Sequence, residues 1–498
     1  MKRITILVLA TSFILQFTYA QRVKFKMSNG IFKEGEINGG LFNFQDDNFW
    51  SLVGSPSKKQ GMIQLYSYSL KQFNHDLKVI NTQKLPDYLP AYFSTFIFGN
   101  YIAFNGANDV HMVNTTRKEN IIVFTDKEFN MVKEVNRKVR NENFRYTDDF
   151  RLTKSEDSTK LIAMAFVNEN AGKPGGPKLK ALIEVYDSKL EVIWQKSFYT
   201  AKYLGDDPRP VRCMMLRDNR IIIITTDNEG SSSKLRVCIL TDQESEPQVF
   251  SRVFKYPTMS FSYYLKDPET IIIGGLASNA DRAKEMFYLE FNLNKNDFVI
   301  ENSINLDKTF TSSYPDISKP LDKAYPKSSF YSTDYFIPFG DGSLMVFDGS
   351  YYLESMYNPR PITFVSFNTE GQVKWVKLIP RFLETTFEDF TSYKVFVQDD
   401  KLQIFYGTDP ETDGKMDVPF AAKNIVTGIG MFYSELDVNG KLSPGKLLIK
   451  SNMDAFSYSI SGIHRMSDNV FVTDCKLFKN RMDHKPGINL GLITLIDK

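Results

Sequence analysis

The chain has 498 residues, with 61 Lys and Arg against 59 Asp and Glu, a formal net charge of +2 and an aromatic content of 14%. A nearly neutral chain lacks the basic surplus from which nucleic-acid binding draws its affinity, so we expect no nucleic-acid partner. The three cysteines, Cys213, Cys238 and Cys475, are too few for a disulfide framework and lack metal-ligand spacing. We expect buried apolar thiols, with one Cys213–Cys238 bridge as the alternative.

The first 20 residues have the layout of a secretory signal peptide. Lys2 and Arg3 precede an apolar run over residues 4–17, and Ala20 offers a small residue for cleavage. The run is about fourteen residues long, whereas a membrane-spanning helix needs roughly 20, and no later segment is as apolar. We therefore predict a signal peptide over residues 1–20, one mature domain over residues 21–498, no membrane span, and a periplasmic or extracellular location.

A short hairpin pattern recurs along the mature chain. In each copy a turn rich in Asp and Asn joins two runs of β-branched and aromatic residues, which is the usual signal for a β-hairpin. Eight copies predict a repeat fold rather than several domains. They lie at residues 45–54, 98–106, 155–166, 217–224, 266–275, 340–349, 398–407 and 467–474.

A second hairpin follows each first one, at residues 68–80, 124–135, 182–198, 239–253, 290–300, 366–378 and 435–449. The eighth copy is one strand short, since the chain stops just after residues 491–497. Residues 22–27 alternate basic and apolar side chains and have no hairpin partner, so we predict that they pair with residues 491–497. A period of roughly 60 residues then predicts an all-β fold, a single β-propeller of eight four-stranded blades closed by both chain ends. Seven blades with an accessory hairpin is the alternative.

Two of the second hairpins carry a Trp seven residues after an Asp or Asn. Asp187 and Trp194 form one pair, and Asn368, Gly371 and Trp375 form the other. The chain thereby resembles the β-propeller superfamily, and these residues resemble the Asp, Gly and Trp pattern of quinoprotein-type propeller repeats. The resemblance implies that each Trp ring docks between adjacent blades. No cofactor-binding pattern accompanies it, so we expect no cofactor.

The links between hairpins are long and would emerge on one face of a propeller. Function tends to lie on such loops over a rigid scaffold, so this loop-rich face is the predicted working face. The long links are residues 106–119, 168–180, 307–332, 349–360, 407–428 and 475–488.

Metal binding has little support in the sequence. The four histidines are spread over three repeats, with His75 in the first, His111 in the second, His484 on a long link of the eighth and His464 on the predicted innermost strand of the eighth, and we expect no metal site from them. Asp409, Glu411 and Asp413 alternate like the first half of a calcium-binding loop. Phe420 occupies the place of the closing Glu, so we expect a solvated acidic loop, with calcium as the alternative.

Acidic and tyrosine side chains gather where innermost strands are predicted to begin, beside the loop-rich face. Tyr offers flat apolar area with a polar hydroxyl, and a carboxylate holds a hydroxyl, an amine or a cation. We predict that a set of such residues lines the mouth of the central channel and binds a ligand. The alternative is that the rings plug the channel and the Asp residues cap strand ends. The set is Asp148, Asp149, Tyr263, Asp334, Tyr335, Tyr393 and Tyr458.

The sequence predicts an exported binding or scaffold protein that recognises a protein, peptide or glycan on its loop-rich face. The alternative is a propeller enzyme that acts on glycans or peptides with paired carboxylates at the channel mouth. A purely structural role is a third possibility. No nucleophile motif, phosphate-binding loop or dinucleotide fingerprint is present, so we name no catalytic residue.

Overall fold

The computed structural model describes residues 22–27, 37–43, 49–60, 63–74, 76–85, 92–112, 115–126, 128–139, 151–169, 178–206, 208, 211–279, 282–314, 329–353, 356–359, 361–381, 392–408, 430–450, 456–477 and 487–496. The predicted signal peptide, Asp148, Asp149, His75, His484 and the acidic loop at residues 409–417 lie outside these ranges.

The described residues form eight antiparallel sheets. In seven of them the four main strands follow one another in chain order, and in the eighth β1 (Arg22–Met27) lies beside β34 (Gly487–Ile496); two sheets also carry one additional short strand. We number the sheets 1 to 8 by their order in the chain. Sheets 1 to 7 each join one predicted first hairpin to the second hairpin that follows it, and sheet 8 uses both ends of the chain. The prediction of eight four-stranded sheets of the β-propeller class is therefore confirmed.

The chain divides into two compact units, which are described separately. Unit 2 takes the described residues within Leu85–Gly349 and Ile362–Leu378 and holds sheets 2 to 6, apart from the ends of β23 and β26. Its strands are β6 (Tyr92–Phe98), β7 (Tyr101–Met112), β8 (Thr115–Thr125) and β9 (Met131–Val139); β10 (Arg151–Lys154), β11 (Leu161–Glu169), β12 (Lys178–Tyr186) and β13 (Val192–Tyr199); β14 (Val211–Met215), β15 (Ile221–Glu229), β16 (Ser232–Leu240) and β17 (Gln248–Phe254); β18 (Thr258–Asp267), β19 (Thr270–Asn279), β20 (Arg282–Asn292) and β21 (Asp297–Asn305); and β22 (Ser329–Phe339), β23 (Gly342–Leu353), β25 (Ile362–Phe367) and β26 (Val373–Ile379).

Unit 1 takes the described residues within Met1–Lys84, Ser350–Pro361 and Ile379–Lys498 and holds sheets 1, 7 and 8. Its strands are β2 (Ile37–Asn43), β3 (Phe49–Gln60), β4 (Ile63–Phe73) and β5 (Val79–Lys84); β27 (Tyr393–Gln398), β28 (Lys401–Thr408), β29 (Gly430–Asp437) and β30 (Lys446–Lys450); β31 (Phe456–Tyr458), β32 (His464–Ser467), β33 (Val470–Leu477), β34 (Gly487–Ile496) and β1 (Arg22–Met27); and the short β24 (Met356–Pro359), which pairs with the end of β23.

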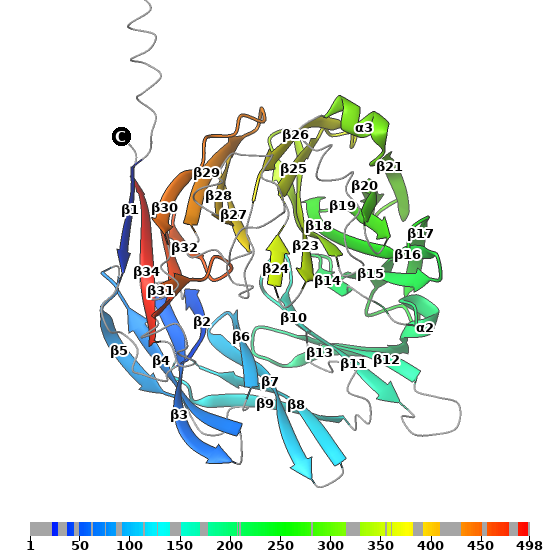
Figure 1. Ribbon diagram of the computed structural model, residues 1–498. Coiled ribbons are helices and arrows are strands. Elements are labelled where there is room, and N and C mark those ends of the chain that lie inside the picture. Colours follow the sequence, from blue (N-terminus) through cyan, green and yellow to red (C-terminus); the bar gives the residue numbers. More distant parts are fainter. Residues whose placement is uncertain are drawn as a thin grey trace, which may run out of the picture. The chain divides into compact units, whose positions relative to one another are not determined.

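The two ends of the chain pair with each other, as predicted. β1 is the antiparallel neighbour of β34, with Arg22 opposite Ile496 and Met27 opposite Gly491 (Figure 1). The Phe25 ring covers Gly491 so closely that a Cβ there would lie 2.6 Å from Phe25 Cζ. Because residue 491 is glycine, the Phe25 ring of β1 has room to pack on β34.

Five second hairpins turn in the same way, because one side chain organises the backbone. In sheet 3, Oδ1 of Asp187 accepts hydrogen bonds from the backbone N–H groups of Lys189 (2.9 Å) and Glu191 (2.8 Å), and the third residue after Asp187, Leu190, has φ 65°. A side-chain oxygen that mimics the turn's own hydrogen bonds is the reason Asp and Asn favour such positions. The five turns begin at Asn74, Asp126, Asp187, Asn368 and Asp437.

The positive-φ position of these turns takes Gly in two sheets and a large apolar residue in three. Gly371 and Gly440 adopt φ 74° and 78° without a steric penalty. Leu77, Phe129 and Leu190 adopt φ 62–65° although left-handed backbone is unfavourable for such residues. All three side chains are buried, with exposed fractions of 3%, 4% and 0%, so apolar burial offsets the strained backbone.

Within unit 2 each sheet packs its face on the next. Leu190 and Tyr186 of sheet 3 lie in one cluster with Phe124 of sheet 2. Trp194 of sheet 3 packs on the apolar cluster shared by sheets 3 and 4, which confirms the docking that the Asp–Trp spacing predicted. Between sheets 5 and 6 the contact is aromatic, and the Tyr288 ring lies 5.6 Å from Phe367, centroid to centroid.

Unit 1 uses the same face-to-face packing. Phe405 of sheet 7 stacks edge-on against Phe471 of sheet 8, with centroids 4.8 Å apart. Val53, Phe73 and Leu77 of sheet 1 share a cluster with Val472 and Leu490 of sheet 8. Each sheet in the cluster therefore buries apolar side chains against its neighbour.

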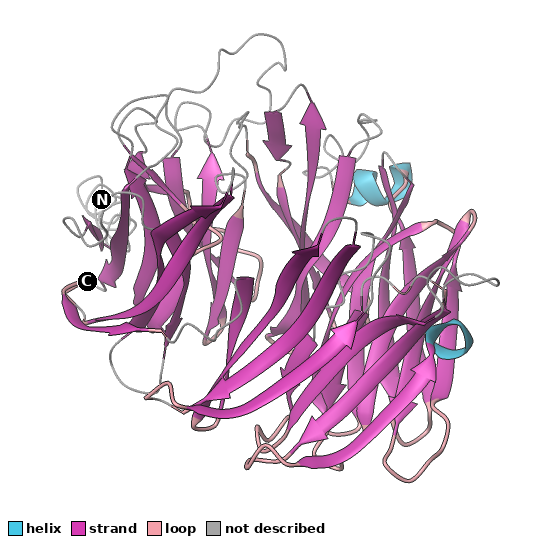
Figure 2. Ribbon diagram, turned by 90° about the horizontal axis from the view of Figure 1, so that it is seen from below, coloured by secondary structure: helices cyan, strands magenta, loops and turns pink. Residues whose placement is uncertain are grey.

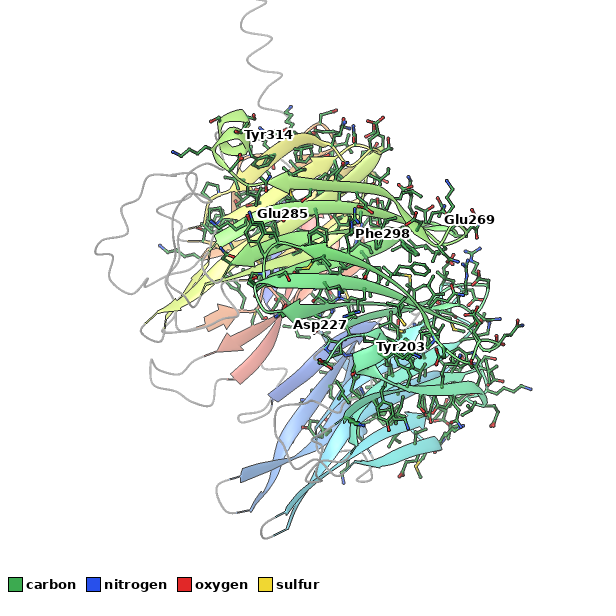
Figure 3. All side chains as sticks on the ribbon, turned by 90° about the vertical axis from the view of Figure 1, so that its right-hand side faces the viewer. Tyr203, Asp227, Glu269, Glu285, Phe298 and Tyr314 are labelled. Carbon is green, nitrogen blue, oxygen red and sulfur yellow. The ribbon has the colours of Figure 1, made fainter. Side chains whose placement is uncertain are left out.

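Two short helices lie at sheet ends, α2 (Thr200–Tyr203) and α3 (Lys308–Ser313), the latter capped by Asp307 (Figure 2). Beside α2, Gly205 (φ 103°) packs on the carboxyl group of Asp227, and Figure 3 shows Asp227 near Tyr203. Among the described residues no helix is long and apolar enough to cross a membrane.

Two of the predicted long links need correction. Residues 106–119 are not a loop, because β7 and β8 continue their pairing to Met112 and Thr115. Residues 349–360 are not a loop either, because the end of β23 pairs with β24, with Leu353 opposite Met356. The alternative of a Cys213–Cys238 bridge is ruled out, since both residues lie opposite Ile223, one on each side of β15. Two strand spacings separate their Cα atoms by about 10 Å, beyond the reach of a disulfide, and both thiols are free.

Candidate functional site on the innermost strands

The first strand of each sheet is the innermost one of a propeller blade. In unit 2 these strands include β10, β14, β18 and β22. Figure 1 shows β14 and β18 on the inner side of the unit, and β17 and β21, the last strands of the same sheets, at its outer side. We call the surface formed by these four innermost strands the inner wall of unit 2. Side chains of these strands that face a neighbouring sheet, such as Val211 and Phe261, pack in the apolar clusters between sheets, whereas Arg151 and Arg212 are exposed and available to a ligand.

The free edge of β14 is closed by groups from both neighbouring sheets. β14 pairs with β15 on one side only, which leaves three alternate carbonyl groups on the other side. Arg151 Nη1 donates to the carbonyl of Val211 (2.6 Å), the Tyr263 hydroxyl donates to that of Cys213 (3.4 Å), and the Glu156 N–H donates to that of Met215 (2.9 Å). Satisfying these acceptors fixes β10 and β18 beside β14.

Asp334 and Tyr335 lie on β22, which is joined to β18 by two hydrogen bonds that Thr333 donates to Ser260. The Thr333 N–H donates to Ser260 Oγ (2.7 Å), and the Thr333 hydroxyl donates to the Ser260 carbonyl (3.1 Å). Asp334 is exposed and Tyr335 is half-buried. The structure therefore puts two of the predicted ligand-binding residues on the same inner wall as Tyr263.

Tyr263 lies in the middle of β18, opposite Ile273 of β19, and not at the start of the strand. Burial raises the pKa of its hydroxyl to about 12, the thiol of Cys213 adds to this increase, and the charge of Arg212 opposes it. The group is thus a neutral hydrogen-bond donor over the physiological pH range. The hydroxyl donates to the backbone carbonyl of Cys213, and no other described side chain donates to that carbonyl.

Tyr393 and Tyr458 belong to unit 1 and are buried, with exposed fractions of 7% and 1%. The guanidinium of Arg381, itself 2% exposed, lies 5.5 Å from the centre of the Tyr393 ring. Tyr458 is part of the core between sheets 7 and 8, and burial raises the pKa of its hydroxyl well above the usual value. These two residues pack the interior. The grouping of all seven residues around one mouth stays a prediction.

Two arginines on the inner wall were missed by the sequence reasoning. Arg151 opens β10, and Arg212 is the second residue of β14; both are exposed. A signal for them exists, because each is a single Arg between two apolar or thiol-bearing neighbours at the start of a first strand, in Phe150-Arg151-Leu152 and Val211-Arg212-Cys213.

Metal ligands do not gather in the part of the chain that the structure describes, where no group of three His, Cys, Asp or Glu side chains is close enough to hold an ion. His464 opens β32, on the innermost side of sheet 8 as predicted. Desolvation, followed by the charge of Lys394, lowers the pKa of its imidazole. His111 lies on β7, opposite Thr116.

Comparison with known proteins gives fold likeness only. No family model matches the chain, and no curated relative matches it. Among solved structures, the WD40 domain of SCAP from fission yeast has a TM-score of 0.41 and 9% identity, covering 96% of this chain and 98% of that one. The polysaccharide lyase Uly1 has a TM-score of 0.40 and 8% identity, covering 83% and 93%. Oligopeptidase B from Leishmania major has a TM-score of 0.38 and 7% identity, covering 90% and 54%.

These identities and scores carry no argument about activity. The order of the strands, the packing of each sheet on its neighbour and the pairing of the two chain ends are features of the chain itself. On these observations the chain is a β-propeller protein with eight four-stranded sheets.

Proposed function

We propose that this chain is an exported propeller protein that binds a ligand or a protein partner on its loop-rich face, as a recognition module or scaffold in the periplasm or outside the cell. The observation that carries the proposal is the character of the inner wall of unit 2. Its first strands present Arg151, Arg212, Asp334 and Tyr335 at least partly to solvent, instead of the apolar residues that fill the contacts between sheets.

Rigidity supports a binding role for this wall. The hydrogen bonds that close the edge of β14 and join β18 to β22 hold four strands in register before any ligand arrives. A surface that is already ordered loses little conformational entropy on binding, so more of the contact energy appears as affinity. The apolar clusters behind the wall fix the same strands from the other side.

The N-terminal segment supports the proposed export and location. A charged start, a short apolar run and a small residue before position 21 form the pattern that secretion machinery recognises. Mass spectrometry of the protein from a membrane-enclosed compartment or culture fluid tests this directly. We expect a mature N-terminus at Gln21, and an intact N-terminus at Met1 would contradict export.

A thermal-shift screen against glycans and peptides tests the binding role, since any ligand that prefers the folded state raises the melting temperature. The substitutions Asp334→Asn and Asp148→Asn then separate a binder from an enzyme. We expect both variants to keep most of the shift that the best ligand produces. If the wild-type chain converts that ligand into a product and either substitution abolishes the conversion, the protein is an enzyme and the proposed binding role is wrong.

A further inference from the structure

The inner wall of unit 2 brings one guanidinium group and one phenol to the two backbone carbonyl groups on either side of Arg212. Arg151 reaches from β10 to the carbonyl of Val211 over 2.6 Å, and Val211 directly precedes Arg212. Tyr263 approaches from β18, on the opposite side, and donates to the carbonyl of Cys213, which directly follows Arg212. Arg212 therefore lies between a cation from sheet 3 and a phenol from sheet 5.

The charges of these groups act on one another. Burial, and then repulsion by Arg212, lowers the pKa of Arg151. Arg212 also acts on the hydroxyl of Tyr263, where it opposes the effect of burial. Two like charges that influence each other on a partly desolvated surface raise the free energy of the unliganded protein, and an anion between them would lower it.

Two other arginines that donate to backbone carbonyls, Arg220 and Arg465, have acidic partners, and the pair Arg151 and Arg212 has none among the described residues. Arg220 Nη1 donates to the Leu293 carbonyl (3.0 Å) while its Nη2 lies 2.7 Å from Asp218 Oδ2. Arg465 Nη1 donates to the Val397 carbonyl (3.0 Å) while its Nη2 lies 2.9 Å from Asp468 Oδ1. Arg151 makes the same kind of backbone contact with no carboxylate of the described chain at ion-pair distance.

The hydrogen-bonding capacity of the pair exceeds what the protein uses. A guanidinium has five N–H donors arranged as a planar fork, which matches the oxygens of a carboxylate, sulfate or phosphate group. Among the described contacts, Arg151 uses one donor, on Nη1. The remaining donors of both arginines, with the neutral hydroxyl of Tyr263 beside them, form a set suited to one oxyanion.

We infer that the inner wall of unit 2 holds an oxyanion site, in which Arg151 and Arg212 bind the carboxylate, sulfate or phosphate group of an acidic ligand. This inference rests on the proposed binding role for its location and adds the chemical class of the ligand. Arg151 is at once the edge-closing residue and a ligand contact. Arg212 is exposed and its side chain makes no hydrogen bond or ion pair with a described residue, so its guanidinium is available for the ligand.

Titration calorimetry of the mature chain with acetate, succinate, sulfate and inorganic phosphate, at low and at physiological salt, tests the site. We expect at least one anion to bind with one-to-one stoichiometry and to weaken as salt rises. Arg212→Gln should reduce that affinity about tenfold or more, because it removes a charge-assisted contact. Arg212→Lys should restore only part of it, since the fork is lost. The four anions also show whether a planar or a tetrahedral group is preferred.

Arg220→Gln is the matched control, since it removes an arginine that donates to a backbone carbonyl and already has an acidic partner. It should leave anion affinity unchanged. The inference fails if none of the anions binds, or if Arg212→Gln binds as the wild type does. It also fails if binding appears only after Asp148→Asn and Asp149→Asn, since those acids would then be the partners of the arginines. A neutral glycan that binds without regard to Arg212 would overturn the oxyanion site and leave the proposed binding role standing.

Discussion

The Cα of Gly371 lies against the ring of Tyr288, so that a Cβ at residue 371 would come within 2.4 Å of Tyr288 Cδ1. The turn of sheet 6 therefore packs directly on sheet 5, and the backbone there also has φ 74°. Conformation and contact both require glycine. The Asn302 side chain adds a hydrogen bond to the carbonyl of Glu370 beside it.

Replacing Gly371 with Ala should destabilise the protein for both reasons. Left-handed backbone costs a non-Gly residue roughly 1 to 2 kcal/mol, and overpacking adds roughly 1 to 3 kcal/mol, so we expect a loss of about 2 to 5 kcal/mol. Gly230→Ala is the control, because Gly230 has φ 67° and nothing within 4 Å of the position of a Cβ. In urea unfolding, the midpoint of Gly371→Ala should be clearly lower than that of Gly230→Ala. Equal midpoints would show that the Tyr288 ring can move aside for a Cβ at no measurable cost.

At residue 190, substitution by Gly should destabilise the protein less than substitution by Ala, which is the reverse of the usual order. The side chain of Leu190 is fully buried while its φ is 65°. Leu190→Ala loses roughly 2 to 5 kcal/mol of burial and keeps the strained backbone, whereas Leu190→Gly loses the same burial and recovers about 1 kcal/mol. Ile183, buried on β12, is the matched control, and there the Ala variant should have a higher melting temperature than the Gly variant. A melting temperature of Leu190→Ala above that of Leu190→Gly would contradict the offset between burial and strain.

Asp157 should make stability fall in acid. Hydrogen bonds from the Ser155 hydroxyl (2.6 Å), the Thr159 N–H (3.1 Å) and the Thr159 hydroxyl (2.8 Å) lower its pKa to about 2. A depressed folded-state pKa contributes stability that is complete above the ordinary value of 3.8 and is lost as pH falls towards 2. The stability difference between wild type and Asp157→Asn should therefore shrink from pH 5 to pH 3. A carboxyl NMR titration with a midpoint near 3.8 would rule out the effect.

The cysteines should be unreactive in the folded protein. Cys213 is half-buried as a residue, yet desolvation of its thiol raises the pKa to about 12, and burial also raises the pKa of Cys238. Because the thiolate is the reactive form, an aromatic disulfide reagent at pH 8 should modify neither thiol quickly in the native state and all three after unfolding in urea. Rapid modification of one native thiol, lost in Cys213→Ser, would contradict the burial of this side chain.

The repeat could be found from sequence because its signals are local. A polar turn with an apolar strand on each side occupies only ten or so consecutive residues, so all eight first hairpins are predicted in their correct order. The Asp or Asn that accepts backbone N–H groups in the turns of the second hairpins is an equally local signal. Pairing of residues 22–27 with residues 491–497 followed from counting strands. Extension of β7 and β8 was missed, because residues 106–119 contain Gly, Asn and Asp and resemble a loop.

The candidate site was only partly accessible to the same reasoning. Tyr263, Asp334 and Tyr335 lie on first strands as expected, but sequence could not show that Tyr393 and Tyr458 are buried, since that depends on which sheet faces them. Arg151 and Arg212 are 61 residues apart and become neighbours only through the hydrogen bond that Arg151 makes to Val211. Such a long-range contact has no local pattern.

Pairing of β1 with β34 gives the chain a late final step in folding. Every other sheet is built from consecutive residues and can form while synthesis continues, whereas sheet 8 needs a strand from the first residues and one from the last. Until the C-terminus has been released, one side of β34 has no partner, and the Phe25 ring has no Gly491 to cover. Loss of residues 22–27 or of residues 487–496 therefore damages the same sheet, and a fragment ending before Gly487 leaves β1 with nothing to join.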